Sequence, residues 1–315
     1  MHKHPELSYE EHWTSDYVEQ ALRQMDGIEI SRPTKTSVLG IIRGAHPGRK
    51  VGLRADIDAL PIQEDRDDLD FTSEIDGRMH ACAHDAHAAM LLGAAKVLSQ
   101  NKDHLHGEVY MIFQHAEETP PGGAREMVAT GQFNNLDVVF AQHIMTTLPV
   151  GEIHIKSGPV TANSDIFNLT ITGKGGHSSQ PENSVDPVII GSRIVSQVQD
   201  IVSRLASPLD NLVVSVTNFH AGTGAENVIP QTAKISGSVR SASKEMRELA
   251  KEKLEAVTKA NCEIYGAAYD LDYTYGVTAV INDKAETSKV RETLTETFGA
   301  DRVKEMIMMM GGEDF

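Results

Sequence analysis

Residues 80–98, HACAHDAHAAMLLGAAKVL, decide the fold predicted for this chain. Their first eight positions hold a cysteine, three histidines and an aspartate, and residues 88–98 are apolar almost all round. A helix that is apolar on every side is typically buried against a sheet. The stretch therefore predicts a buried helix that begins directly after the densest polar cluster of the sequence.

Short apolar runs and helical stretches alternate on both sides of this helix. Extended runs are expected at residues 51–53, 109–113 and 138–140, and a further helix at residues 11–25. Such alternation is typical of an α/β protein in which helices cover a sheet. The first half of the chain is therefore predicted to form an α/β layered domain.

The second half has a different order of elements. Its expected elements are strands at 166–171, 212–218, 232–239 and 268–274, and helices at 186–205 and 244–260. The resulting order, β-α-β-β-α-β, is that of the ferredoxin-like, or split βαβ, motif. We expect this domain at residues 163–275, inserted into a domain formed by residues 1–162 and 276–315. The latter should also contain a helix at 284–298 and a strand at 306–310, and its end in a loop at Phe315 indicates a C-terminally truncated copy.

Composition excludes several classes of protein. The chain has 315 residues and is 40% hydrophobic, which is enough for a large core and two domains. Its net charge of -16 opposes the phosphate contacts that supply most nucleic-acid affinity. No run approaches the roughly 18 apolar residues of a membrane span and the start is not signal-like, so we expect a cytoplasmic protein. Cys82 and Cys262 are too few for a disulfide framework.

Polar side chains follow each predicted strand of the first domain. They are Arg54, Asp56 and Asp58 after the first strand, His115, Glu117 and Glu118 after the second, and Gln142 and His143 after the third. In open α/β sheets, ligands bind at the carboxyl ends of the strands. Together with residues 80–87, four stretches thus deliver Cys, His, Glu and Asp to one edge.

The residue types at this edge favour a transition metal. Cys82 and His84 are two residues apart, so in a loop both can face one ion. Thiolate, imidazole and carboxylate ligands suit zinc, manganese or cobalt better than calcium or magnesium. In the adjacent pair Glu117 and Glu118, one carboxylate can bind metal while the other takes a proton from water. Each residue alone is more often structural, but their joint placement favours a site.

At these residues the sequence resembles the aminoacylase-like metallopeptidases, in the amidohydrolase branch of hippurate hydrolases, N-acyl-L-amino acid amidohydrolases and auxin-conjugate hydrolases. The matching stretches are HPELS (4–8), LRADIDALP (53–61), MHACAHDAH (79–87), FQHAEE (113–118), GGHS (175–178), AENVIP (225–230) and GGEDF (311–315). The resemblance implies a mixed-sheet catalytic domain of phosphorylase/hydrolase-like type, with the ferredoxin-like domain inserted as a lid.

The resemblance also implies a site for two divalent metal ions, manganese, zinc or cobalt. Its implied ligands are Cys82, His84, Glu118 and His143, and Glu117 would be the general base and acid. In related branches the carboxylate at Asp56 orients a metal-ligand histidine, but Arg54 stands at that position here, which leaves the role of Asp56 open. The family's fifth ligand is a histidine expected beyond the GGEDF loop, where this chain has no residue.

Three residues of the second domain are candidates for contact with substrate. The resemblance implies that the domain forms a homodimer and that His177 of GGHS reaches the partner's active site to hold the developing oxyanion. Asn227 and Arg240 match positions that contact substrate, and an arginine suits a free carboxylate. From the residues alone, the glycines around His177 favour an ordinary exposed turn.

The expected reaction is hydrolysis of the amide bond of an N-acyl amino acid (N-acetyl, benzoyl or similar), which releases a carboxylate and a free amino acid. Two alternatives stay open at this point. Cys82 could be the nucleophile of an amidase, with His84 or His143 as its base. The chain could also be a non-catalytic protein that binds metal or an acyl amino acid.

Overall fold

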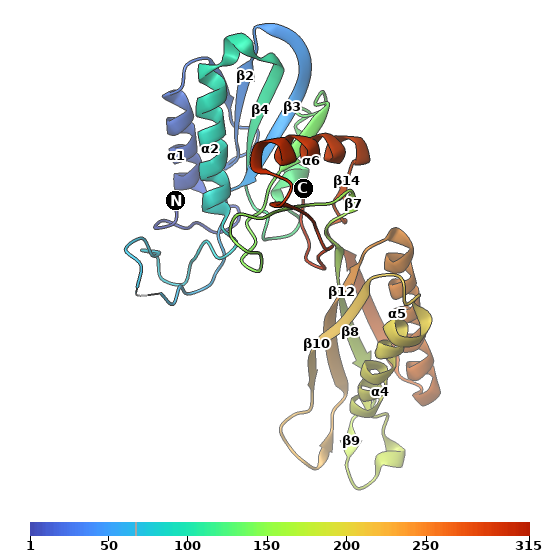
Figure 1. Ribbon diagram of the computed structural model, residues 1–315. Coiled ribbons are helices and arrows are strands. Elements are labelled where there is room, and N and C mark those ends of the chain that lie inside the picture. The colour runs from blue at the N-terminus through green and yellow to red at the C-terminus, as the bar shows by residue number, and fades with distance from the viewer. Residues whose placement is uncertain (67) are drawn as a thin grey trace. The chain divides into compact units, whose positions relative to one another are not determined.

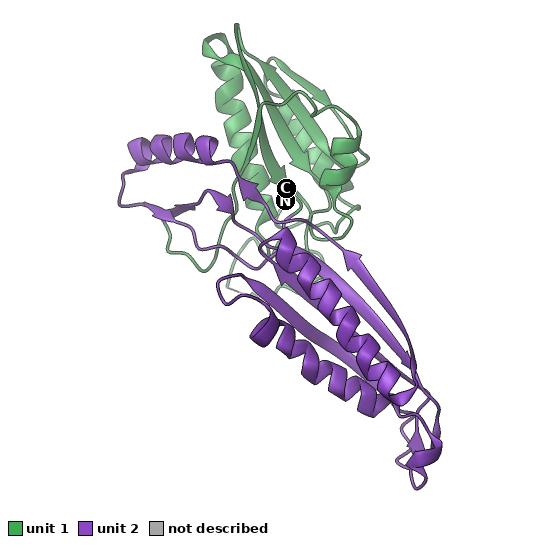
Figure 2. Cartoon of the chain, turned by 90° about the vertical axis from the view of Figure 1, so that its right-hand side faces the viewer, with its two compact units in different colours: residues 1–150, 314–315 green, residues 151–313 purple. Residues whose placement is uncertain are grey.

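The computed structural model describes residues 1–66 and 68–315, which form two compact units (Figures 1 and 2). Unit 1 comprises residues 1–150 and 314–315, and unit 2 comprises residues 151–313. These limits differ from the expected domain limits, because the segments on either side of 163–275 pair with each other. Within unit 2, β6 (Ile153–Ile155) pairs with β15 (Val303–Glu305), and β7 (Gly158–Pro159) pairs with β14 (Ile281–Asn282). The domain limits 163 and 275 stay a prediction.

Unit 1 is built on a mixed five-stranded sheet. In spatial order its strands are β1 (Ile28–Ser31), β2 (Val38–Arg43), β4 (His106–Gln114), β3 (His46–Asp56) and β5 (Val138–Ala141). β2 is antiparallel to both β1 and β4, whereas β3 is parallel to both β4 and β5. The prediction of an α/β fold with a mixed sheet is therefore confirmed.

Helices cover both faces of this sheet. α1 (His12–Arg23) and α2 (His84–Gln100) lie side by side on one face, where they pack on Met111 and Phe113 of β4 (Figure 1). α3 (Gly123–Ala129) packs on the opposite face against Tyr110 and Ile112. Because alternate residues of a strand face opposite sides, β4 is buried on both faces and forms the centre of the unit.

Helix α2 buries one face and not its whole circumference. His84, His87, Ala88 and Leu91 are buried, but Val97 is 60% exposed. The apolar pattern correctly predicts a helix that packs on a sheet, and it overstates how much of that helix is enclosed. The buried face begins with the two histidines.

Unit 2 contains a four-stranded antiparallel sheet whose elements follow the chain order β-α-β-β-α-β. These elements are β8 (Asn163–Thr172), α4 (Pro187–Asp200), β10 (Leu212–Ala221), β12 (Thr232–Ser241), α5 (Lys244–Tyr265) and β13 (Ala268–Tyr275). The strands lie in the order β10-β12-β8-β13. α4 and α5 bury one face of the sheet, and Ile166 on the other face of β8 is 52% exposed.

The last part of unit 2 differs from the sequence expectation in one element. Helix α6 (Lys284–Phe298) is found as predicted, but the strand predicted at residues 306–310 is wrong. The strand is β15, directly before it, because the hydrogen-bonding partner β6 lies opposite Val303–Glu305. Within residues 1–66 and 68–315, no helix combines the length and apolarity needed to span a membrane.

Candidate metal centre

The three parallel strands of unit 1 end at one edge of the sheet, and each brings polar residues there. Asp56 is the last residue of β3, Glu117 and Glu118 follow β4, and His143 follows β5. The carboxyl ends of parallel strands are the usual ligand-binding edge of an α/β sheet. The side chains predicted to meet at this edge are therefore delivered by neighbouring strands.

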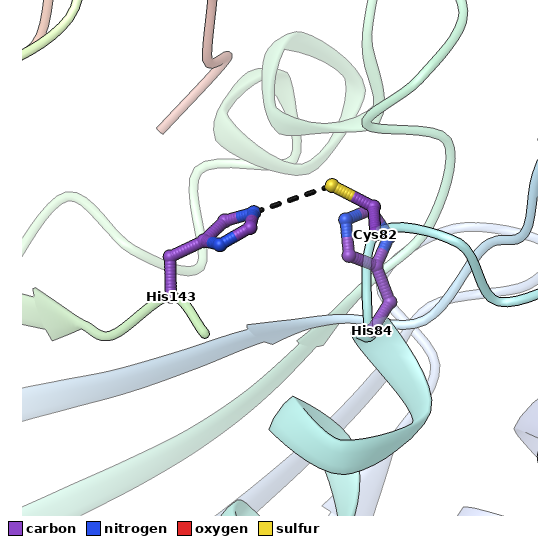
Figure 3. Close-up of side chains that lie close together, drawn as sticks. All are labelled: Cys82, His84 and His143. Carbon is purple, nitrogen blue, oxygen red and sulfur yellow. Dashed lines mark hydrogen bonds between the residues drawn. The ribbon is translucent and has the colours of Figure 1, made fainter. Parts of the chain in front are cut away.

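Cys82, His84 and His143 converge at this edge. Their potential ligand atoms all lie within 4.8 Å of one another, and Cys82 Sγ lies 3.3 Å from His143 Nε2 (Figure 3). Between the first two, Ala83 has a φ of 64°, a left-handed conformation that is uncommon for alanine. This turn ends the loop and begins α2, so the thiol of Cys82 and the ring of His84 face the same space (Figure 3).

Asp58 aligns two of the candidate ligands. His84 Nδ1 lies 3.0 Å from the backbone oxygen of Asp58 and 3.1 Å from its Oδ1. The other carboxylate oxygen of Asp58 accepts hydrogen bonds from the backbone N–H of Glu118 at 3.0 Å and the hydroxyl of Ser8 at 2.7 Å. Since Nδ1 of His84 is occupied by Asp58, its Nε2 is the nitrogen that can bind a metal.

The loop that carries Glu117 and Glu118 is fixed on both sides. Before it, the backbone N–H of Ala116 donates to Glu11 Oε1 at 2.8 Å. After it, the N–H of Gly123 donates to the carbonyl of Ala116 at 3.0 Å. A Cβ at Gly123 would lie 1.9 Å from the backbone oxygen of His115, so only glycine allows this close approach. A loop held in this way suits a catalytic base, which must keep its orientation.

The residues present fit a bound cation. Among the described residues, Nε2 of His84 and Oε1 of Glu118 are buried and have no hydrogen-bond partner. Buried polar atoms nearly always form hydrogen bonds, so these two atoms call for an explanation: they lie 3.9 Å apart, and Nε2 of His84 lies 3.5 Å from Asp56 Oδ2, too far for a good hydrogen bond. An imidazole nitrogen, a carboxylate oxygen and a neighbouring thiol form a donor set that zinc and similar metals prefer.

The electrostatics of the centre also favour a positive charge. Burial by itself would lower the pKa of His84, but the hydrogen bond to Asp58 and the negative charge of Asp56 outweigh it and raise this pKa to about 11. Burial raises the pKa of Glu118, and the charge of Asp58 adds to this effect. In the absence of a metal, the carboxylates thus hold a proton on His84, and a cation would supply the same compensation.

The thiol of Cys82 is not activated by the protein alone. The neighbouring imidazole of His84 favours the thiolate, but burial and the charge of Glu118 outweigh this influence and raise the pKa of Cys82 above its usual value. A cysteine nucleophile requires a lowered pKa, whereas a metal deprotonates a ligating thiol directly. The environment of Cys82 therefore suits a metal ligand better than a nucleophile.

The three candidate substrate contacts all lie in unit 2, and the structure brings two of them together. His177 belongs to β9 (Gly176–His177), which pairs with β11 (Val228–Ile229), and the N–H of Ser178 donates to the backbone oxygen of Asn227 at 3.0 Å. Arg240 lies near the opposite end of β12, roughly 25 Å from Thr232 at the usual rise per residue. His177 and Asn227 are thus neighbours, and Arg240 is remote from both.

Two further residues, to which the sequence pattern assigns no role in the site, shape the centre. His87 lies three residues after His84 on the buried face of α2, and its signal was this helical spacing. Glu11 contacts the loop before Glu117 across 105 residues of sequence, and no local pattern indicates that contact.

Residues 52–315 match the model of peptidase family M20/M25/M40. The chain is 46% identical to an N-acyl-L-amino acid amidohydrolase of Geobacillus stearothermophilus, over 90% of this chain and 76% of that protein. It is 39% identical to an N-acetylcysteine deacetylase of Bacillus subtilis, over 100% of this chain and 82% of that protein. A crystal structure of a dinuclear metal-binding peptidase of the M20 family from Bacillus subtilis superposes with a TM-score of 0.85 at 36% identity, covering 100% of this chain and 81% of the other.

Proposed function

Because this chain belongs to peptidase family M20/M25/M40, we propose that it hydrolyses N-acyl amino acids with two divalent cations held by Cys82, His84, Glu118 and His143. The protein is a metal-dependent amidohydrolase that releases a carboxylate and a free amino acid. The observation that supports the site assignment is that His84 Nε2 and Glu118 Oε1, near the thiol of Cys82, are buried and have no hydrogen-bond partner among the described residues.

The two proposed histidine ligands each present one defined atom to the cations. Asp58 occupies Nδ1 of His84, and the carbonyl of Ile144 occupies Nδ1 of His143 at 2.7 Å, so both rings present Nε2. When bound, divalent cations lower the pKa of water and polarise the acyl oxygen of the substrate. The thiol and imidazole donors favour manganese, zinc or cobalt. We also propose that the enzyme acts in the cytoplasm.

Glu117 is the proposed proton carrier. Its carboxylate lies within 4.8 Å of ligand atoms of both His84 and Glu118, close enough to accept a proton from a water held beside them. Glu117 takes a proton from this water as its oxygen attacks the acyl carbon. When the C–N bond breaks, Glu117 gives the proton to the departing amine. The water oxygen thus ends in the released carboxylate and the proton in the released amino acid.

Residues 163–275 of unit 2 are the proposed ferredoxin-like lid and dimerisation domain. His177 and Asn227 lie at one end of its sheet and Arg240 near the other, a separation much longer than an N-acyl amino acid. One substrate molecule cannot contact both ends. In a homodimer, His177 and Asn227 would serve the partner's active site, with His177 stabilising the oxyanion, while Arg240 binds a substrate α-carboxylate.

The test is a panel of N-acetyl, N-benzoyl and N-indoleacetyl amino acids, assayed for free amino acid with manganese, zinc or cobalt. We expect release with at least one acyl group, no release after chelation, and slow turnover of a matched N-acyl amine that lacks the α-carboxylate. If isothermal titration shows that an N-acyl amino acid binds to metal-loaded protein without any product, the chain is a binding protein and the proposal is wrong.

A further inference from the structure

Two histidines in the first turn of α2 differ in the hydrogen bonding of their Nε2 atoms. His84 and His87 are three residues apart on the same buried face, and both are at most 2% exposed. Nε2 of His84 has no hydrogen-bond partner among the described residues. Both ring nitrogens of His87 are in use: Nδ1 lies 2.7 Å from Asp56 Oδ1, and Nε2 lies 2.9 Å from the backbone nitrogen of Ile144.

These contacts fix the tautomer of His87. A backbone N–H can only donate, so Nε2 of His87 accepts from Ile144 and carries no proton. The proton therefore sits on Nδ1, which donates to Asp56. Ligand atoms of His87, Asp56 and His84 all lie within 4.8 Å of one another, but His87 cannot bind a metal without breaking one of its two bonds.

Asp56, the residue that orients His87, is itself clamped. Its Oδ2 accepts from Arg54 Nη1 at 2.9 Å. Arg54 also donates through Nε to Gln114 Oε1 at 2.8 Å and through Nη2 to Asp314 Oδ1 at 3.0 Å. Asp56 is 1% exposed and Arg54 is 7% exposed, so the pair is sealed from water and the hydrogen bond from Arg54 holds the Asp56 carboxylate in place. Asp56 thus orients a histidine that is not itself one of the proposed ligands.

The other end of His87 leads to His143. The residue that donates to His87, Ile144, accepts through its carbonyl from His143 Nδ1 at 2.7 Å. The rings of His87 and His143 meet edge to face, with centroids 4.6 Å apart. Since β5 ends at Ala141, His143 sits in an irregular exposed segment, and these contacts supply the orientation that the strand no longer provides.

We propose that His87 is a positioning residue for the metal centre. Held by Asp56 and Arg54, it fixes the backbone of Ile144 and thereby aims Nε2 of His143 at the space beside Cys82. This inference rests on the proposed function, in which His143 is a metal ligand. Such outer contacts typically change metal affinity or activity by about 10- to 100-fold.

Two substitutions separate the two bonds of His87. In His87→Gln the amide can place an oxygen near the former Nε2 and keep an acceptor for Ile144. In His87→Asn the amide nitrogen replaces Nδ1 and keeps only the bond to Asp56. Metal-free protein is titrated with Co²⁺, and the thiolate-to-cobalt absorption of Cys82 reports binding. We expect His87→Asn to weaken binding about 10- to 100-fold and His87→Gln to weaken it clearly less. Equal losses would show that His87 merely fills space.

A double-variant cycle tests whether the effect passes through His143. His87→Asn is combined with His143→Ala, and Co²⁺ affinity is measured for all four proteins after thermal unfolding confirms that each is folded. We expect His87→Asn to add no further loss when His143 is already absent, whereas losses that multiply would overturn the proposal. His154→Asn, which breaks a 2.9 Å histidine contact to Glu152 in unit 2, is the matched control and should leave affinity unchanged.

Measurements on the wild-type protein distinguish a failure of the proposed function from a failure of the role proposed for His87. Wild-type protein that binds Co²⁺ and hydrolyses an N-acyl amino acid supports the proposed function whatever the variants do. Wild-type binding with multiplying losses therefore overturns only the positioning role of His87. Wild-type protein that binds no Co²⁺ overturns both.

Discussion

Replacing Glu11 with alanine should destabilise unit 1 and impair the loop that carries Glu117, the proposed catalytic base. Glu11 is fully buried, and its Oε1 accepts from the backbone N–H of Tyr9 at 3.0 Å and of Ala116 at 2.8 Å. Ala116 directly precedes Glu117 and has a φ of 50°. The left-handed region costs a non-glycine residue about 1–2 kcal/mol, so this backbone must be held in place by its contacts.

The size of the effect follows from the two bonds. Alanine leaves the N–H groups of Ala116, which is buried, and of Tyr9, which is partly buried, without this acceptor. At about 1–3 kcal/mol for each donor, a total of about 4 kcal/mol is expected. Glutamine keeps an oxygen for both donors. Burial raises the pKa of Glu11, which means that the folded state disfavours the charged form. The folded state therefore gains stability as the pH falls through the raised pKa to the ordinary value of a glutamate. At pH 7 the neutral glutamine avoids this penalty, so Glu11→Gln should stay within about 1 kcal/mol of wild type.

Thermal unfolding of the metal-free proteins at pH 7 measures the difference. A loss of about 4 kcal/mol corresponds to a midpoint roughly 10 °C lower for a unit of this size. The hydrolysis rate should fall for Glu11→Ala and hold for Glu11→Gln. Glu10→Ala is the control, because the side chain of this neighbour forms a surface ion pair with Arg78, whose loss should change stability little. An alanine variant that unfolds with wild type, or a glutamine variant as unstable as the alanine one, would refute the reasoning.

Three further predictions concern the metal centre. Glu117→Gln should keep its metal in equilibrium dialysis yet lose about 10²- to 10⁴-fold in turnover, and substantial activity in a metal-replete sample would remove Glu117 from its role. Cys82→Ala should retain less metal after dialysis, as measured by elemental analysis. Chelation of the wild-type protein should abolish hydrolysis until a divalent metal is restored. If iodoacetamide inactivates the enzyme and a chelator does not, Cys82 is instead a nucleophile. Burial opposes ionisation of Asp58, but its hydrogen bond with His84 prevails and holds the pKa of Asp58 below its usual value. The stabilisation from ionised Asp58 is therefore present above about pH 4 and is lost as the pH falls through the lowered pKa. The unfolding free energy of Asp58→Asn should consequently fall less steeply in acid than that of the wild type. An unchanged acid dependence would contradict this.

Local sequence pattern was sufficient to predict helices and strands whose apolar residues are buried against the sheet. The apolar runs at β4 and β5 and the helical pattern at α2 predict those elements because burial on a sheet requires such residues. Residues 306–310, four of them methionine, have the same apolar pattern and still form no strand. A strand needs a hydrogen-bonding partner, and β6 lies opposite the preceding residues, a fact of pairing that apolarity does not encode.

The sequence by itself determined which chemistry this protein can carry. Thiol, imidazole and carboxylate groups occur after successive strands, and parallel strands must end at a common edge, so residue type and order were enough to predict a metal centre there. Only the tertiary structure decided what each of two identical side chains does. Nε2 of His84 has no hydrogen-bond partner among the described residues, whereas both ring nitrogens of His87 form hydrogen bonds. The difference arises from Asp58 at a sequence separation of 26 from His84, and from Asp56 at 31 and Ile144 at 57 from His87. Hydrogen bonds act over about 3 Å in space, and spacing along the chain does not reveal which distant groups will be that close.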